Sequence, residues 1–168
     1  MKLNLGCGNK KKEGFIGVDK YPCGAVDKIS DINETLPFAT DSIDEIWADN
    51  IIEHVNDISR FMRECHRISK DNGVMTIFTP HYSSNASWRD PTHLHHLSYF
   101  SMDHFEKPSV DHYTGGGFKV VEKKLSFGGG IMGITGRLIF MASPKAYEAK
   151  WSFIFRASTL KFILQVVK

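Results

Sequence analysis

This chain of 168 residues carries a formal net charge of +2 at pH 7, and 42% of its residues are hydrophobic while 24% are charged. The length fits one domain with one hydrophobic core, and the composition excludes a disordered or fibrous protein. The small net charge gives no reason to expect nucleic acid as a partner. We therefore expect a single globular domain over residues 1–168.

Three cysteines, Cys7, Cys23 and Cys65, are spread along the chain without the spacing of a metal site or a disulfide framework. Such usage is typical of a reducing compartment. The N-terminal residues form no apolar run of signal-peptide length, and no run approaches the roughly 20 apolar residues of a membrane-spanning helix. These observations predict a cytoplasmic protein.

Short apolar runs predict parallel strands at residues 3–5, 15–19, 45–48 and 74–78. Helix-like segments alternate with them, which indicates an α/β fold. Only residues 9–14 link the first two strands, although a parallel crossover normally needs a dozen or more residues. We therefore expect the first crossover helix to be reduced to a turn.

A helix is predicted over residues 58–70, because apolar residues recur there at spacings of three and four. These residues are Ile58, Phe61, Met62, Cys65 and Ile68. Asn56 or Asp57 can cap the start of this helix, and Gly73 can end it before the next strand.

The second half of the chain opens with a polar loop, rich in histidine and aromatic residues, over residues 83–102. So long an irregular stretch is usually functional. Two further strands are predicted at residues 118–127 and 160–167. Between them, the apolar residues of 128–158 suggest a buried or amphipathic helix.

A glycine-rich turn, Gly6-Cys7-Gly8, follows the first predicted strand directly. Because glycine has no β-carbon, a ligand can approach the backbone of such a turn closely. Asp19 ends the second predicted strand, where a carboxylate can accept both hydroxyls of a ribose. The third glycine of a dinucleotide-binding fingerprint is absent, so this pattern alone does not identify the ligand.

Three further segments extend the pattern: Asp31-Ile32, the run from Trp47 to Val55 that contains Glu53-His54, and residues 63–73. With the glycine turn and Asp19, they resemble the class I S-adenosylmethionine-dependent methyltransferases, particularly the small methyltransferase type 11-like group. The resemblance implies a Rossmann-like three-layer sandwich with a mostly parallel seven-stranded sheet and an antiparallel last strand. Residues 128–158 would be a variable insertion before that strand.

The resemblance also implies S-adenosylmethionine as the cofactor. It assigns cofactor binding to Leu5, Gly6, Cys7, Gly8, Asp19, Lys20, Asp31, Ile32, Asp49, Asn50 and His54. Structural roles stay open for some of them, since Asp19 and Asp31 could stabilise turns and Asp49 and Asn50 could cap a helix. His54 could also be a half-buried histidine with satisfied hydrogen bonds.

The histidine-rich loop supplies candidates for contact with the methyl acceptor. His81 and His93 are the candidate catalytic residues, because histidine can move a proton near neutral pH. Metal binding is the alternative for this loop, but no H-E-x-x-H or paired C-x-x-C motif supports it, so no metal site is expected.

We expect a methyltransferase that acts on a small-molecule or glycan acceptor. One alternative is a nicotinamide-dependent oxidoreductase on a similar sheet, and another is a cofactor-binding protein without catalytic activity. The short first crossover should leave part of one sheet face bare. The apolar residues of 128–158 therefore predict a homodimer or a peripheral membrane contact.

Overall fold

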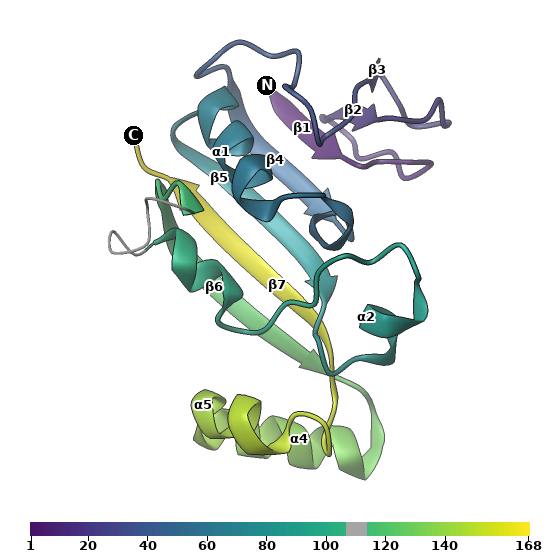
Figure 1. The fold of residues 1–168 in the computed structure, drawn as a ribbon, viewed down its shortest axis with the longest axis vertical. Coiled ribbons are helices and arrows are strands. Elements are labelled where there is room, and N and C mark those ends of the chain that lie inside the picture. Colours follow the sequence, from purple (N-terminus) through teal and green to yellow (C-terminus); the bar gives the residue numbers. More distant parts are fainter. Residues whose placement is uncertain (107–113) are drawn as a thin grey trace.

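The computed structural model describes residues 1–106 and 114–168, which form one seven-stranded sheet in the order β3-β2-β1-β4-β5-β7-β6 (Figure 1). The strands are β1 (Lys2–Leu5), β2 (Ile16–Asp19), β3 (Lys28–Ile29), β4 (Ile43–Asp49), β5 (Ser69–Pro80), β6 (Phe118–Phe127) and β7 (Ala157–Val166). Strands β1 to β5 pair in parallel, whereas β7 runs antiparallel to both β5 and β6. The predicted mostly parallel sheet with an antiparallel last strand is confirmed.

One face of the sheet carries the hydrophobic core. The register joins Leu3, Ile46, Met75 and Leu164 in one row across four strands, and all four side chains are fully buried. Helix α1 (Ile58–Ile68) contributes four buried side chains to this core, Phe61, Met62, Cys65 and Ile68. Figure 1 shows α1 lying across the central strands of the sheet.

Helix α1 begins where the sequence indicates, because the Asp57 side chain accepts a hydrogen bond of 3.0 Å from the Arg60 amide. The predicted end of the helix, residue 70 followed by Gly73, is wrong. The helix ends at Ile68, and Ser69 already belongs to β5, where it pairs with Ile43. Pairing with a distant strand therefore overrides the local helical pattern.

No helix joins β1 to β2, so the predicted reduction of the first crossover is confirmed. The opposite sheet face, which that helix would cover, carries the partly exposed rings of Trp47 and Phe78. The link itself gives some cover, since the Lys12 ammonium group lies 3.7 Å from the centroid of the Trp47 ring.

The segment between β6 and β7 contains α4 (Gly130–Ala142), α5 (Pro144–Ala146) and the π-helical turn η4 (Tyr147–Trp151). Figure 1 shows α4 and α5 beyond the ends of β6 and β7, not over the bare face of the sheet. Phe140 packs against Tyr99 and Tyr147, with ring centroids 4.9 and 5.7 Å away. Within the described part of the chain, no helix has the length and apolar character needed to cross a membrane.

Short helical turns complete the fold near the carboxyl ends of the central strands. They are η1 (Ile52–His54), α2 (Asn85–Arg89) and η2 (Ser101–Phe105). They belong to the segments that follow β4 and β5, which is where ligands bind in open α/β sheets.

Candidate functional site

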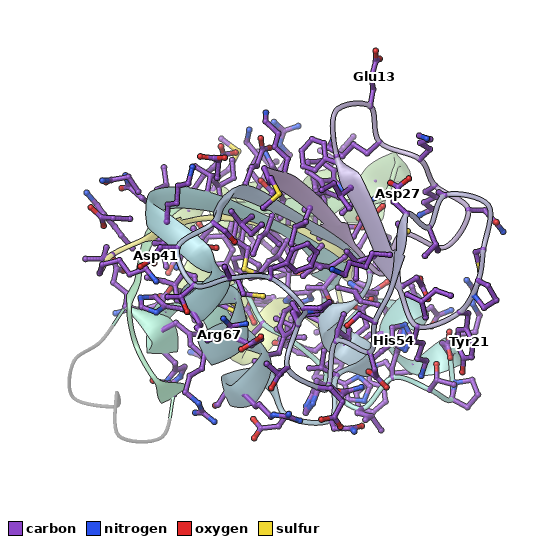
Figure 2. All side chains as sticks on the ribbon, turned by 90° about the horizontal axis from the view of Figure 1, so that it is seen from above. Glu13, Tyr21, Asp27, Asp41, His54 and Arg67 are labelled. Carbon is purple, nitrogen blue, oxygen red and sulfur yellow. The ribbon has the colours of Figure 1, made fainter. Side chains whose placement is uncertain are left out.

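A cavity of about 510 Å³ opens at the carboxyl ends of β1, β2 and β4. It is lined by Gly6, Asp19, Lys20, Tyr21, Asp31, Ile32, Asn33, Ile51, His54, Thr92 and Leu94. Figure 2 shows two of these residues, His54 and Tyr21, on one side of the molecule and Asp41 and Arg67 on the other. The cavity thus combines an apolar wall with two carboxylates, as in sites for small polar ligands.

The glycine turn forms one wall of this cavity and needs both glycines. Gly6 has φ of 64° and Gly8 has φ of 48°, a region that other residues rarely adopt. A β-carbon on Gly6 would lie only 2.3 Å from Cδ1 of Ile51. The Gly6 amide donates to the Val18 carbonyl over 2.8 Å, which ties the turn to β2.

Two backbone amides hold the Asp19 carboxylate at the mouth of the glycine turn. Gly8 N–H donates to Oδ2 over 2.9 Å, and Tyr21 N–H donates to Oδ1 over 3.0 Å. A carboxylate oxygen can accept more than one hydrogen bond, so both oxygens keep acceptor capacity for a ligand.

Asp31 is held in a similar way by one neighbour. Its Oδ1 accepts from the backbone and side-chain nitrogens of Asn33, at 2.9 and 3.0 Å. Asp31 and Ile32 line the same cavity as Asp19, so the sequence-predicted pair of acidic positions lies around one space.

Several predicted cofactor residues have other surroundings. Leu5 is fully buried in the sheet, and the Cys7 thiol donates to the Ala25 carbonyl at 3.4 Å. Burial raises the pKa of the Cys7 thiol, which disfavours the thiolate that a nucleophile needs. Asp49 accepts a 2.9 Å hydrogen bond from Asn50, whose own φ is 55°.

Asp49 and Cys7 line a second, smaller cavity of about 200 Å³. This cavity shares Gly6 with the larger one and is bordered by Lys10, Lys11 and Lys12. The Lys10 ammonium group lies 3.3 Å from Asp49 Oδ2. Most predicted cofactor residues therefore line one of two cavities that share Gly6, whereas Leu5, Gly8 and Asn50 line neither.

Glu53, His54 and His93 form a cluster beside the larger cavity. The rings of His54 and His93 meet edge to face, with centroids 4.6 Å apart, and His93 Nε2 lies 4.0 Å from Glu53 Oε1. Burial, the largest cause, raises the pKa of Glu53, although the Thr79 hydroxyl, both histidines and the Glu53 backbone act in the opposite direction. Glu53 was not among the candidate site residues, although its place in the Glu-His pair could have indicated it.

His81, the other predicted catalytic histidine, lies outside the cavity lining and is fully buried. Ser83 N–H and the Ser83 hydroxyl contact Nδ1 at 3.2 and 2.8 Å, so Nδ1 is the acceptor and Nε2 carries the proton. That Nε2 donates to Glu148 over 3.0 Å. Both ring nitrogens are thus occupied, which leaves His81 no free lone pair for proton transfer.

In comparison with known proteins, residues 20–77 match the model of the Methyltransferase domain family. A probable S-adenosylmethionine-dependent methyltransferase of Mycobacterium tuberculosis is 28% identical over 132 residues, which cover 65% of this chain. They cover 46% of that relative, so this chain spans about half its length.

Solved structures of low sequence identity share the fold. A SAM-dependent methyltransferase of Archaeoglobus fulgidus has a TM-score of 0.63 and 19% identity, covering 98% of this chain and 85% of its own. The [4+2]-cyclase SpnF has a TM-score of 0.59 and 13% identity, covering 99% of this chain and 75% of its own. The fold therefore occurs with more than one chemistry, and the reaction must be argued from the site.

Proposed function

We propose that this chain is a class I S-adenosylmethionine-dependent methyltransferase and that it transfers a methyl group to a small-molecule or glycan acceptor. The observation that carries the proposal is the cavity that joins the glycine turn to Asp19 and Asp31. A dinucleotide site would instead open with three glycines.

The residues around this cavity fit S-adenosylmethionine. Gly6 lines the cavity, and Asp19 offers a charged acceptor on the same lining for ribose hydroxyls. Asp31 and Ile32 would border the adenine, with Lys20 beside them. When bound, the cofactor supplies an electrophilic methyl group on a cationic sulfur.

The remaining predicted residues would serve the methionine part of the cofactor. Asp49 carries a negative charge that suits an ammonium group, and the neighbouring lysines suit a carboxylate. Asn50, at the end of β4, fixes the direction of Asp49 through its side-chain hydrogen bond. Leu5 and Cys7 would support the glycine turn as buried packing residues.

The acceptor would enter on the side of His54, Thr92 and Leu94. Methyl transfer needs an aligned nucleophile, and it needs a base only when the acceptor begins protonated. The His93 ring contacts the His54 ring edge to face, so these two histidines are the candidate bases on that side. For His81 we propose a structural role, because Ser83 and Glu148 occupy both nitrogens.

Calorimetric titration with S-adenosylmethionine and, separately, with NAD tests the cofactor assignment. We expect S-adenosylmethionine to bind one site per chain and NAD to give no saturable heat. Preferential binding of NAD would instead support an oxidoreductase. Binding of S-adenosylmethionine without methylation of any component of a small-molecule and glycan extract would favour a non-catalytic binding protein.

A surface outside this site favours a partner. Apolar side chains of the segment between β6 and β7 are exposed, namely Ile131, Met132, Ile134, Leu138, Met141, Trp151, Phe153 and Ile154. The same segment holds four exposed cations, Arg137, Lys145, Lys150 and Arg156, while its single acid, Glu148, is bonded to His81. We infer peripheral contact with an anionic membrane, because lipid headgroups complement these cations.

The free cysteines Cys7, Cys23 and Cys65 fit a cytoplasmic location.

A further inference from the structure

We propose that Glu53, His54 and His93 form a binding site for a divalent transition-metal ion of the zinc class. The sequence gives no metal-ligand spacing for these residues, since His93 lies 39 positions after His54. The fold brings one ligand atom of each residue within 4.8 Å of the other two.

The hydrogen bonds of both histidines leave the same nitrogen free. His93 Nδ1 lies 2.9 Å from the Ser87 carbonyl oxygen, and His54 Nδ1 lies 3.2 Å from the Thr92 carbonyl oxygen. A carbonyl oxygen can only accept, so this network assigns a proton to Nδ1 of each ring. In the neutral imidazoles, Nε2 then carries the lone pair that a metal needs.

This arrangement matches the usual support of metal-binding histidines. Such histidines donate their other ring N–H to a carbonyl or carboxylate, which fixes the tautomer and the direction of the ring. The Thr92 hydroxyl adds a second contact to His54 Nδ1 at 3.1 Å and donates a hydrogen bond of 2.7 Å to Asp90 Oδ1. Both rings are therefore held in place before any ion binds.

Glu53 supplies the negative charge. Only 1% of its surface is exposed, and neither carboxylate oxygen has a hydrogen-bond partner within the described residues. Burying an unpaired carboxylate is costly, so native structures pair such a group, protonate it or use it as a metal ligand. The 4.0 Å between Glu53 Oε1 and His93 Nε2 is too long for a direct hydrogen bond and leaves space for a bridging cation.

The ligand set favours a first-row transition metal over magnesium or calcium, which prefer oxygen ligands. Two imidazoles and one carboxylate are the protein ligands of several catalytic zinc sites, which keep a fourth position open. A tetrahedral zinc site has ligand atoms roughly 3.4 Å apart, so these side chains would move inward by about 1 Å.

The ion would lie on the acceptor side of the cavity, because His54 and Thr92 line that side. An open coordination position there would place a Lewis acid beside the acceptor. This last step rests on the proposed function, whereas metal binding itself does not. The competing occupant is a proton on His93 Nε2, which also lies 4.0 Å from Asp90 Oδ2.

Metal binding is tested on the full chain after treatment with a chelator and dialysis. Titration with zinc sulfate followed by calorimetry should give one site per chain, and the cobalt(II)-loaded protein should absorb visible light as a four-coordinate complex does. His54→Ala, His93→Ala and Glu53→Gln should each weaken zinc binding at least about 10-fold, since changing even the partner of a ligand costs 10–100-fold. The matched control is His66→Ala, because the His66 ring bonds to the Val167 carbonyl and lies outside the cluster.

Thermal unfolding of each metal-free variant shows whether weaker zinc binding comes from a missing ligand or from a loss of folding. His54 is partly exposed, so His54→Ala still tests the site if Glu53→Gln unfolds. Folded wild-type protein that binds no zinc would overturn the proposal and favour the proton on His93. Equal zinc binding by the three ligand variants would also overturn it. A parallel titration of the zinc-free protein with S-adenosylmethionine reports on the proposed function separately.

Discussion

The Gly8 amide donates a 2.9 Å hydrogen bond to the Asp19 carboxylate, so the glycine turn after β1 and the acid at the end of β2 form one unit. Only residues 9–15 lie between the turn and the start of β2, and they contain no helix. In the absence of a crossover helix, this bond and the one from Gly6 to Val18 set the position of the turn. Changes at Asp19 should therefore affect both ligand and loop.

Asp19→Ala should weaken binding of S-adenosylmethionine by about 1–3 kcal/mol, because ribose hydroxyls lose a charged acceptor. Calorimetric titration measures the loss. Glu13→Ala is the matched control, since Glu13 is an exposed acid in the same loop and lies outside the cavity lining. An unchanged dissociation constant in Asp19→Ala would remove Asp19 from the cofactor site.

Alanine at the two glycines of the turn should have unequal effects on the free energy of unfolding. Both positions have positive φ, which costs an alanine about 1–2 kcal/mol. Only Gly6→Ala also meets Ile51, and this overpacking should add about 1–3 kcal/mol. At Gly8 a β-carbon meets no atom within 4 Å.

Urea unfolding of the two glycine variants measures this difference. Equal losses of stability would mean that Ile51 moves aside freely, and the fit of the turn against the cavity wall would then be looser than the structure indicates. Gly6→Ala should also lose more affinity for S-adenosylmethionine than Gly8→Ala, as measured by titration of the folded fraction.

Glu148 should make the fold less stable in acid. Burial alone would raise the pKa of Glu148, but hydrogen bonds from His81, the Tyr99 amide and the Tyr82 side chain outweigh it and lower the pKa below 4.5. A lowered carboxyl pKa stabilises the folded state above the unfolded pKa, and this stabilisation is lost as the pH falls through the folded value. Glu148→Gln should therefore cost about 1–3 kcal/mol near neutral pH and progressively less below pH 4.5.

Unfolding curves of wild type and Glu148→Gln between pH 3 and pH 7 check this dependence. A difference in stability that stays constant over the whole range would show that the charge of Glu148 does not matter.

His81→Ala should destabilise the fold without changing affinity for S-adenosylmethionine, because His81 lies outside the cavity lining. Loss of affinity in the folded variant would return His81 to the functional site.

The sequence predicts most of the sheet and the glycine turn because both depend on neighbouring residues. Period-two and period-three-to-four patterns identify β1, β4, β6 and α1. Strand β3 has only two residues, Lys28 and Ile29, and its pairing with β2 has no local pattern.

The histidines show where local patterns stop being informative. His81 and His93 look alike in sequence, yet one bonds to Glu148, 67 residues away, and the other faces Glu53, 40 residues away. Only the folded chain decides which histidine has a free nitrogen. The same is true of Glu53, whose neighbours along the chain do not indicate that it is buried without a partner.

The apolar surface of α4 should bind anionic vesicles. Ile131, Leu138 and Met141 are 80%, 60% and 68% exposed, and the cations Arg137 and Lys145 lie in the same segment. Exposed apolar area beside cations binds lipid through burial of side chains and attraction to headgroups. Sedimentation with vesicles of phosphatidylserine and phosphatidylcholine should therefore carry the protein down, and vesicles of phosphatidylcholine alone should carry down less.

Leu138→Glu should reduce vesicle binding, because it removes an exposed apolar side chain and places a negative charge against the negatively charged headgroups of the lipid. Val121→Glu is the matched control, since Val121 is 59% exposed on β6 and lies outside α4. Raising the salt concentration should weaken binding of the wild type by screening the attraction. A stable dimer without lipid that Leu138→Glu dissociates would assign this surface to a second copy of the chain, and a monomer that ignores both vesicle types would mean that α4 has neither partner.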